Sequence, residues 1–206
     1  MPQMALLRWY VAHKAAALCA EGKAADLGCG PGLLVAELAR QAPGLHVTGV
    51  DLSDEMLDMA ERTVQQAGLG ARAAFKKGDV GRLPFPDGSL DLAVSTLSLH
   101  HWGDPSAVFD EVARVLRSPD PERGVAGGAF VIFDLRRDLA MPLWLLLWFV
   151  THVVVPPALR RANEPLASRD ASYTPDEAAR LVGRSRLRGW RVTMGPLWLI
   201  VEGRKV

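Results

Sequence analysis

Short apolar runs alternate with helical patterns along most of the chain, and this alternation limits the fold more than any other feature. The apolar runs that predict strands lie at 23–28, 46–52, 71–80, 90–99 and 127–135. The helical patterns between them lie at 33–42, 53–68 and 104–116. Strands connected through helices form parallel βαβ units. We therefore expect an α/β fold with a Rossmann-like, doubly wound, mostly parallel sheet.

The two ends of the chain complete this sheet. A helix over roughly residues 4–20 comes first, and a capping box of Thr174, Pro175 and Glu177 begins the last helix. Runs at 187–195 and 197–205 follow, and Gly195-Pro196 between them favours a turn. The sequence thus predicts seven strands with a terminal antiparallel hairpin.

The length of 206 residues suits one domain, which we divide by the role of each part. We expect an N-terminal helical cap (1–21), a ligand-binding core (22–135), an apolar insertion (138–172) and a final helix with two strands (173–206). The net charge of +1 gives no case for nucleic acid as a partner. Cys19 and Cys29 are too few for a disulfide framework, and no signal peptide is recognisable, so we expect a cytoplasmic protein.

A glycine turn, AADLGCGPG, follows the first predicted strand. Ligands of open α/β sheets bind beyond the carboxyl ends of the strands, where Gly28, Gly30 and Gly32 lie. A dinucleotide turn would place its third glycine at Leu33, and a Walker loop would end in Gly-Lys-Ser/Thr. Neither pattern is present.

Two aspartates at the ends of the first two strands predict the charge of the ligand. Asp26 lies beside the turn with no cation in it to offset a phosphate, so an amine or sulfonium is favoured over a phosphate. Asp51, about twenty residues later, can accept both hydroxyls of a ribose. A nucleoside with a cationic tail fits both, and S-adenosylmethionine meets that description.

Four segments in order carry a specific resemblance: ADLGCGPG, VTGVDLSDEML, KGDVGRLPFPDGSLDLAVSTLSLHHW and VFDEVARVLRSPDPERGVAGGAFVIFDL. Over residues 22–135 the chain resembles the class I S-adenosylmethionine-dependent methyltransferases, closest to the ubiquinone/menaquinone-biosynthesis-type small-molecule branch. The resemblance implies S-adenosyl-L-methionine as the cofactor. It also implies a set of cofactor-binding residues: Asp26, Gly28, Cys29, Gly30, Gly32, Asp51, Leu52, Met56, Asp79, Val80 and Leu97.

The loop after the fourth predicted strand, where this fold places acceptors, contains the candidate catalytic residues His100 and His101. A base is needed only if the acceptor loses a proton, and histidine has the appropriate pKa. On alternating geometry the two side chains point in opposite directions, so one at most is expected to face the cofactor. Shaping of the pocket is the alternative role for both.

The apolar stretch MPLWLLLWFVTHVVVPP is the least typical part of the chain. It is too short for a bilayer span, which needs roughly twenty residues, and apolar on nearly every face, so we expect it to be buried. We favour a lid over an apolar substrate; a homodimer surface or a peripheral membrane contact through residues 143–155 are the alternatives. The candidate substrate-binding residues are Tyr10, His101, Trp102, Trp144, Trp148, His152 and Tyr173.

These patterns lead to one expected function and two rivals. We expect methyl transfer to a small, lipophilic acceptor that is quinone-, phenol- or polyketide-like. A noncatalytic protein that binds the same nucleoside as a partner or regulator would keep the glycine turn and Asp51. A nicotinamide oxidoreductase is a poor fit because of Leu33 and Asp26. No Cys/His spacing in the sequence suggests a metal site.

Overall fold

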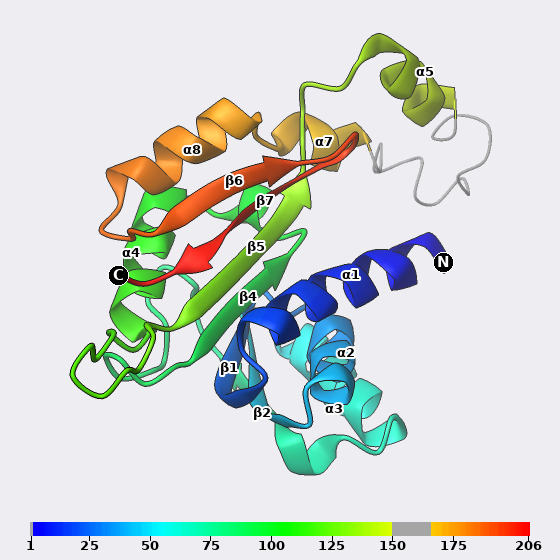
Figure 1. Ribbon diagram of the computed structural model, residues 1–206. Coiled ribbons are helices and arrows are strands. Elements are labelled where there is room, and N and C mark those ends of the chain that lie inside the picture. The colour runs from blue at the N-terminus through cyan, green and yellow to red at the C-terminus, as the bar shows by residue number, and fades with distance from the viewer. Residues whose placement is uncertain (1, 150–165) are drawn as a thin grey trace.

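A single seven-stranded sheet forms the centre of the protein in the computed structural model, which describes residues 2–149 and 166–206 (Figure 1). The strand order is β3-β2-β1-β4-β5-β7-β6. The strands are β1 (Glu21–Leu27), β2 (Gly44–Asp51), β3 (Ala73–Lys77), β4 (Leu92–Thr96), β5 (Ala129–Leu135), β6 (Trp190–Met194) and β7 (Trp198–Arg204). Strands β1 to β5 are mutually parallel, and β7 runs antiparallel to both β5 and β6. The predicted doubly wound sheet with a terminal hairpin is confirmed.

The connections reverse direction beside β1, and this reversal defines where a ligand can enter. From β1 the chain moves outward through β2 to β3, and then returns to place β4 on the other side of β1. The loops that leave the carboxyl ends of β1 and β4 therefore diverge. This topological switch point is where open α/β sheets bind ligands.

Helices cover both faces of the sheet (Figure 1). One face packs against α1 (Pro2–Leu18), α2 (Leu33–Gln41) and α3 (Asp54–Gln66), through side chains such as Val11, Leu38 and Val64. The other face packs against α4 (Pro105–Val115) and α8 (Pro175–Arg184), through Phe109 and Val182 among others. Alternate residues of each central strand enter the two cores, which is why these strands are apolar throughout.

The helices begin at the residues that the sequence indicates. The Ser53 hydroxyl accepts a hydrogen bond from the Met56 amide, and the Asp104 carboxylate accepts one from the Ala107 amide. Thr174 and Glu177 form the reciprocal capping box at the start of α8. Each such cap satisfies amides that the first helical turn leaves unpaired.

The apolar insertion leaves the sheet after β5. It contains α5 (Met141–Phe149), which stands apart from the sheet in Figure 1, and α7 (Leu166–Ala171). Met141, Leu145 and Phe149 are exposed and follow one another at four-residue spacing, so one apolar face of α5 is uncovered. No described element packs on that face, so the expected burial under a substrate, against a second copy or at a membrane stays a prediction.

Part of the segment predicted to contact a substrate, a second copy or a membrane lies outside the described residues. His152 and residues 150–155 lie outside the described residues, as do the side chains of Trp144 and Trp148. Among the helices in the described ranges, none combines the length and the hydropathy that crossing a bilayer requires.

Candidate functional site

A cavity of about 520 Å³ opens at the switch point, beyond the carboxyl ends of β1, β2 and β4. Segments that are far apart in the sequence contribute to it because parallel strands end at the same edge. Its lining residues are Gly28, Gly30, Asp51, Leu52, Met56, Gly78, Asp79, Val80, Leu97, Ser98, His101, Trp102 and Gly103. Most of the residues predicted to bind the cofactor thus surround one cavity.

The glycine turn after β1 is held against β2 by its own backbone. The amides of Gly28 and Cys29 both donate to the Val50 carbonyl, at 2.9 and 3.0 Å. Gly28 has a φ of 69°, and a Cβ there would come within 2.1 Å of the Ser98 hydroxyl oxygen. Only glycine permits both this backbone conformation and the close approach of the two loops.

Asp51, at the end of β2, stabilises the turn from the opposite side. One oxygen accepts from the Gly30 amide at 2.8 Å and the other from the Ser53 amide at 3.0 Å. A carboxylate oxygen has more than one lone pair, so both remain able to accept a hydroxyl. Asp51 therefore has the place and the acceptor capacity that a ribose requires.

Asp26 differs from every other acid near the cavity, because it is buried without a partner. Asp26 lies two residues before Gly28 in the sequence. Its side chain has 1% of its surface exposed, and neither carboxylate oxygen has a hydrogen-bond donor within the part of the chain that the structure describes. Burial, with the charge of Asp51 as the second cause, raises the pKa of Asp26 to about 8. A cation supplied by a ligand would oppose this shift, because it stabilises the ionised carboxylate.

Cys29 lies within the same turn and lines a smaller, adjoining cavity rather than the main one. Burial raises the pKa of its thiol above the ordinary value, and the nearby Asp26 and Asp51 raise it further. A thiol in this state is a poor nucleophile. It acts as a small packing residue of the turn.

Leu97, directly after β4, has a strained backbone. Its φ is 55°, which no other non-glycine residue in the described ranges matches in sign. Such a conformation costs roughly 1–3 kcal/mol and is concentrated at functional sites. Leu97 lines both the main cavity and the smaller one, so the strained bend carries the β4 loop across the sheet edge where the two cavities meet.

His100 and His101 occupy different environments, on a short 3₁₀ turn (Leu99–His101). His101 lines the main cavity together with Trp102. The His100 ring is buried, and its Nδ1 lies 2.8 Å from Asp134 Oδ1. The His100 amide also donates to Asp134, at 2.9 Å. Of the two candidate bases, His101 is therefore the one that faces the cavity.

Two further predicted residues lie away from the main cavity. Tyr10 on α1 packs against Trp198, with ring centroids 5.8 Å apart. Tyr173 packs against the core beneath α8, where burial and the charge of Asp134 raise the pKa of its hydroxyl. Their roles in substrate binding remain predictions.

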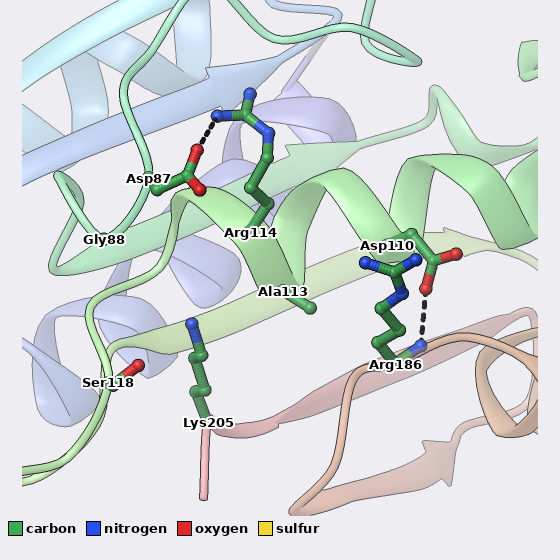
Figure 2. Close-up of a pocket in the computed structure, with 8 residues that line it drawn as sticks. All are labelled: Asp87, Gly88, Asp110, Ala113, Arg114, Ser118, Arg186 and Lys205. Carbon is green, nitrogen blue, oxygen red and sulfur yellow. Dashed lines mark hydrogen bonds and ion pairs between the residues drawn. The ribbon is translucent and has the colours of Figure 1, made fainter.

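A second large cavity, of about 560 Å³, lies at the other end of α4 (Figure 2). Its two carboxylates have partners within the protein: Asp87 contacts Arg114 at 2.7 Å, and Asp110 accepts from the Arg186 backbone amide. The Lys205 ammonium donates to the Leu116 carbonyl at 2.8 Å. None of the residues expected at the site lines it, so we place the candidate active site at the glycine turn.

Comparisons with known proteins point to the same segment of the chain. Residues 25–119 match the family described as "Methyltransferase domain". A demethylmenaquinone methyltransferase of Lactobacillus johnsonii is 36% identical over 103 residues, or 50% of this chain and 42% of that protein. One of Porphyromonas gingivalis is 30% identical over 176 residues, or 82% of this chain and 66% of that protein.

The fold comparison covers almost the whole chain. A SAM-dependent methyltransferase from Aquifex aeolicus superposes with a TM-score of 0.70 at 18% identity, covering 97% of this chain and 92% of that one. The chain belongs to the class I S-adenosylmethionine-dependent methyltransferases. It spans less than half of the Lactobacillus protein and about two thirds of the Porphyromonas protein.

The cofactor of this methyltransferase family fits the site on chemical grounds. The glycine turn and Asp51 offer backbone amides and a carboxylate to a nucleoside, and Asp26 is a buried carboxyl group with no hydrogen-bond partner in the described part of the chain. A sulfonium compound with an ammonium group supplies positive charge to that carboxylate, whereas a phosphate would add negative charge.

Several residues of the site were not predicted from the sequence. Gly78, Ser98 and Gly103 line the main cavity, and Asp134 holds His100 in place. Asp134 could have been predicted from the sequence, because it lies near the end of β5. Asp26 and Asp51 lie in the same way at the ends of β1 and β2. Ser98 carries no comparable signal, since its place depends on the strained bend at Leu97.

Proposed function

We propose that the protein transfers the methyl group of S-adenosylmethionine to a small, apolar acceptor of the quinone, phenol or polyketide type. The observation that carries this proposal is the buried, unpartnered Asp26, two residues before Gly28, which lines a nucleoside-sized cavity. A phosphorylated ligand would leave that carboxylate without a counterion, and a cationic one would not.

The chain's own contribution to the reaction is alignment and exclusion of water. When bound, S-adenosylmethionine supplies a methyl carbon activated by the positive sulfur. Asp51 and the glycine turn would fix the nucleoside end, while Leu97 and Ser98 hold the wall between the two cavities. His101 and Trp102 line the cavity at the β4 loop, where an acceptor would approach and where His101 could take up its proton.

The apolar character of the acceptor is supported by exposed apolar side chains on two helices. α5 exposes Met141, Leu145 and Phe149, and α1 exposes Leu6 and Trp9. Exposed apolar faces of this extent favour a ligand or partner that covers them. The relatives named demethylmenaquinone methyltransferase are in keeping with such an acceptor.

Binding and turnover test the proposal in two steps. We expect calorimetry to show binding of S-adenosylmethionine and of its demethylated product, S-adenosylhomocysteine, and none of NAD. A screen of lipophilic phenols and hydroquinones should then generate S-adenosylhomocysteine, and hydrophilic acceptors should not. NAD binding in the absence of the sulfur nucleosides would overturn the cofactor assignment; cofactor binding without turnover on any acceptor would favour a noncatalytic partner or regulator.

The role of the histidines is tested by two separate substitutions. If His101 is the base, His101→Ala should lower turnover by roughly 10²–10⁴-fold while cofactor affinity is retained. His100→Ala should change turnover less, because His100 acts through the shape of the loop. Unchanged rates in both variants would show that the loop only shapes the pocket.

A further inference from the structure

The connection between β3 and β4, residues 78–91, contains no helix, whereas each of the other connections among β1 to β5 contains one. Part of the sheet face opposite α2 and α3 is therefore covered by a loop. A cavity of about 630 Å³ lies between this loop and the strands. Its lining residues are Gly22, Lys23, His46, Thr48, Lys76, Phe85, Pro86, Ser89 and Leu90, and none of these lines the main cavity.

Three groups that can carry positive charge line this cavity, one from each of three neighbouring strands. Lys23 of β1 and His46 of β2 are register partners, so their side chains leave the same face from strands about 4.8 Å apart. Lys76 of β3 is the register partner of Val50, which lies four residues beyond His46. Side chains at even spacing share one face of a strand, so Lys76 projects from that same face. The cavity therefore has a cationic pair at one end and a further cation at the other.

No acid balances these groups. The residues that line the cavity include no acid, and within the described ranges no ion pair holds the side chains of its two lysines or its histidine. The adjacent Asp91 is already engaged, because it accepts from the Lys23 backbone amide at 2.7 Å and contacts Arg117 at 2.7 Å. Lys77, the next residue on β3, points to the opposite face and pairs with Asp54 of α3. The uncompensated positive charge of the cavity favours an anion.

The loop side of the cavity is apolar. Phe85, Pro86 and Leu90 form it, and the Lys76 ammonium lies 5.1 Å from the centroid of the Phe85 ring. This cation–π contact keeps the lysine along the wall of the cavity. Cavities of about 300–1,000 Å³ with apolar walls and a few converging polar groups are the usual sites of small organic ligands. Volume and walls together suit a flat apolar body that carries an acidic group.

We propose that this cavity binds a small organic anion with an aromatic body. Its acidic group would lie at Lys23 and His46, and its ring against Phe85. The site goes beyond the proposed function and does not depend on it. The connection that forms its wall also lines the main cavity through residues 78–80, so an occupant would border the candidate active site without entering it.

Matched probes separate the charge from the apolar body. 2-Naphthoate and its neutral amide, 2-naphthamide, have the same ring system, so their difference in affinity reports the carboxylate. At neutral pH and about 0.15 M salt, we expect backbone amide shifts in NMR spectra to place 2-naphthoate at residues 22–23, 46–48 and 85–90. Its affinity should be roughly tenfold higher than that of 2-naphthamide. Inorganic phosphate, which has charge but no apolar body, should bind roughly tenfold more weakly than 2-naphthoate.

Substitutions on the two faces of β3 provide the control. Lys23→Gln should lower affinity for 2-naphthoate roughly tenfold and leave affinity for 2-naphthamide unchanged, and Lys76→Gln should have the same effect to a smaller extent. Lys77→Gln removes the same charge from the neighbouring position on the opposite face, so both affinities should be retained.

Several results overturn the inference. They are the absence of saturable 2-naphthoate binding, equal affinity for the acid and the amide, phosphate binding as tight as that of 2-naphthoate, or a loss in Lys77→Gln as large as that in Lys23→Gln. Shifts confined to the glycine turn and residues 97–103 would place the anion in the main cavity and overturn it as well. None of these results bears on methyl transfer.

Discussion

Two buried aspartates at two strand ends have opposite surroundings. Asp134 at the end of β5 and Asp26 at the end of β1 each have 1% of their surface exposed. Asp134 accepts hydrogen bonds from the His100 and Leu135 amides and contacts the His100 ring nitrogen. Asp26 has no donor on either oxygen. The fold therefore supplies donors to the Asp134 carboxylate and supplies none to the Asp26 carboxylate within the described residues.

This difference indicates which end of the sheet waits for a ligand. Buried polar groups are nearly always hydrogen-bonded, because a missing partner costs the desolvation free energy of the group. The His100–Asp134 contact has the properties of a fixed structural element that positions the loop after β4. Asp26 has those of a binding group whose partner arrives with the cofactor.

The largest expected effect is a pH-dependent gain in stability on replacing Asp26. Its pKa is raised to about 8 in the folded protein, so the folded state holds this proton more tightly than the unfolded one. The contribution of Asp26 to folding stability is thus fully present below its pKa in the unfolded chain, near 4. It is lost as the pH rises through its pKa in the folded protein, about 8. At pH 9, Asp26→Asn should stabilise the ligand-free protein on the order of 5 kcal/mol.

Thermal unfolding of both proteins between pH 4 and 9 measures this effect. At pH 4 the two should unfold at similar temperatures, because Asp26 is then protonated in the folded protein and still roughly half protonated in the unfolded one, so the difference in stability is below about 1 kcal/mol. The difference in unfolding temperature should widen as the pH rises. The same substitution should weaken the binding of S-adenosylhomocysteine. A gap that does not change with pH would mean that Asp26 has a partner in solution.

Replacing Asp134 at the end of β5 should destabilise the folded protein. Asp134→Ala removes the acceptor of the His100 and Leu135 amides and of the His100 ring, which leaves buried donors unpaired. We expect a loss of roughly 3 kcal/mol in the free energy of unfolding, measured by urea denaturation.

Asp104→Ala is the matched control for this loss. It removes the carboxylate cap of α4, which accepts a hydrogen bond from the Ala107 amide, and should cost roughly 1 kcal/mol. Equal losses in the two variants would show that the buried network adds nothing beyond a single cap.

Much of this architecture follows from local patterns. The five parallel strands, the capping box at Thr174 and the hairpin at Gly195-Pro196 each depend on a few consecutive residues, and the structure has them where expected. The glycine turn and Asp51 are predictable for the same reason, since their place follows from the strand ends.

Contacts between distant segments are not predictable in this way. The His100–Asp134 pair joins two loops, and the approach of Arg8 to the turn depends on how α1 packs across α2. The exposed face of α5 is a third case: hydropathy predicts that Met141 and Leu145 are buried, but cannot say that no described part of the chain covers them.

The smallest expected effect is a pH dependence of ligand affinity, which follows from the missing hydrogen-bond partner of Asp26. In the free protein Asp26 retains its proton up to about pH 8, because burial and the neighbouring Asp51 both disfavour its charge. An ammonium group beside it would lower the pKa, so the ligand binds the deprotonated form and binding releases a proton. Between pH 6 and 7.5, affinity for S-adenosylhomocysteine should rise by up to about 1.4 kcal/mol, or tenfold, per pH unit.

Calorimetry in two buffers of different ionisation enthalpy counts the proton directly. Close to one proton should leave on binding at pH 7 in the wild-type protein and none in Asp26→Asn, which also controls for the titration of His101 in the same cavity. A wild-type affinity that is flat across this range would place the ammonium elsewhere. Asp26 would then lack a donor for a reason unrelated to the cofactor, and the contrast with Asp134 would lose its functional meaning.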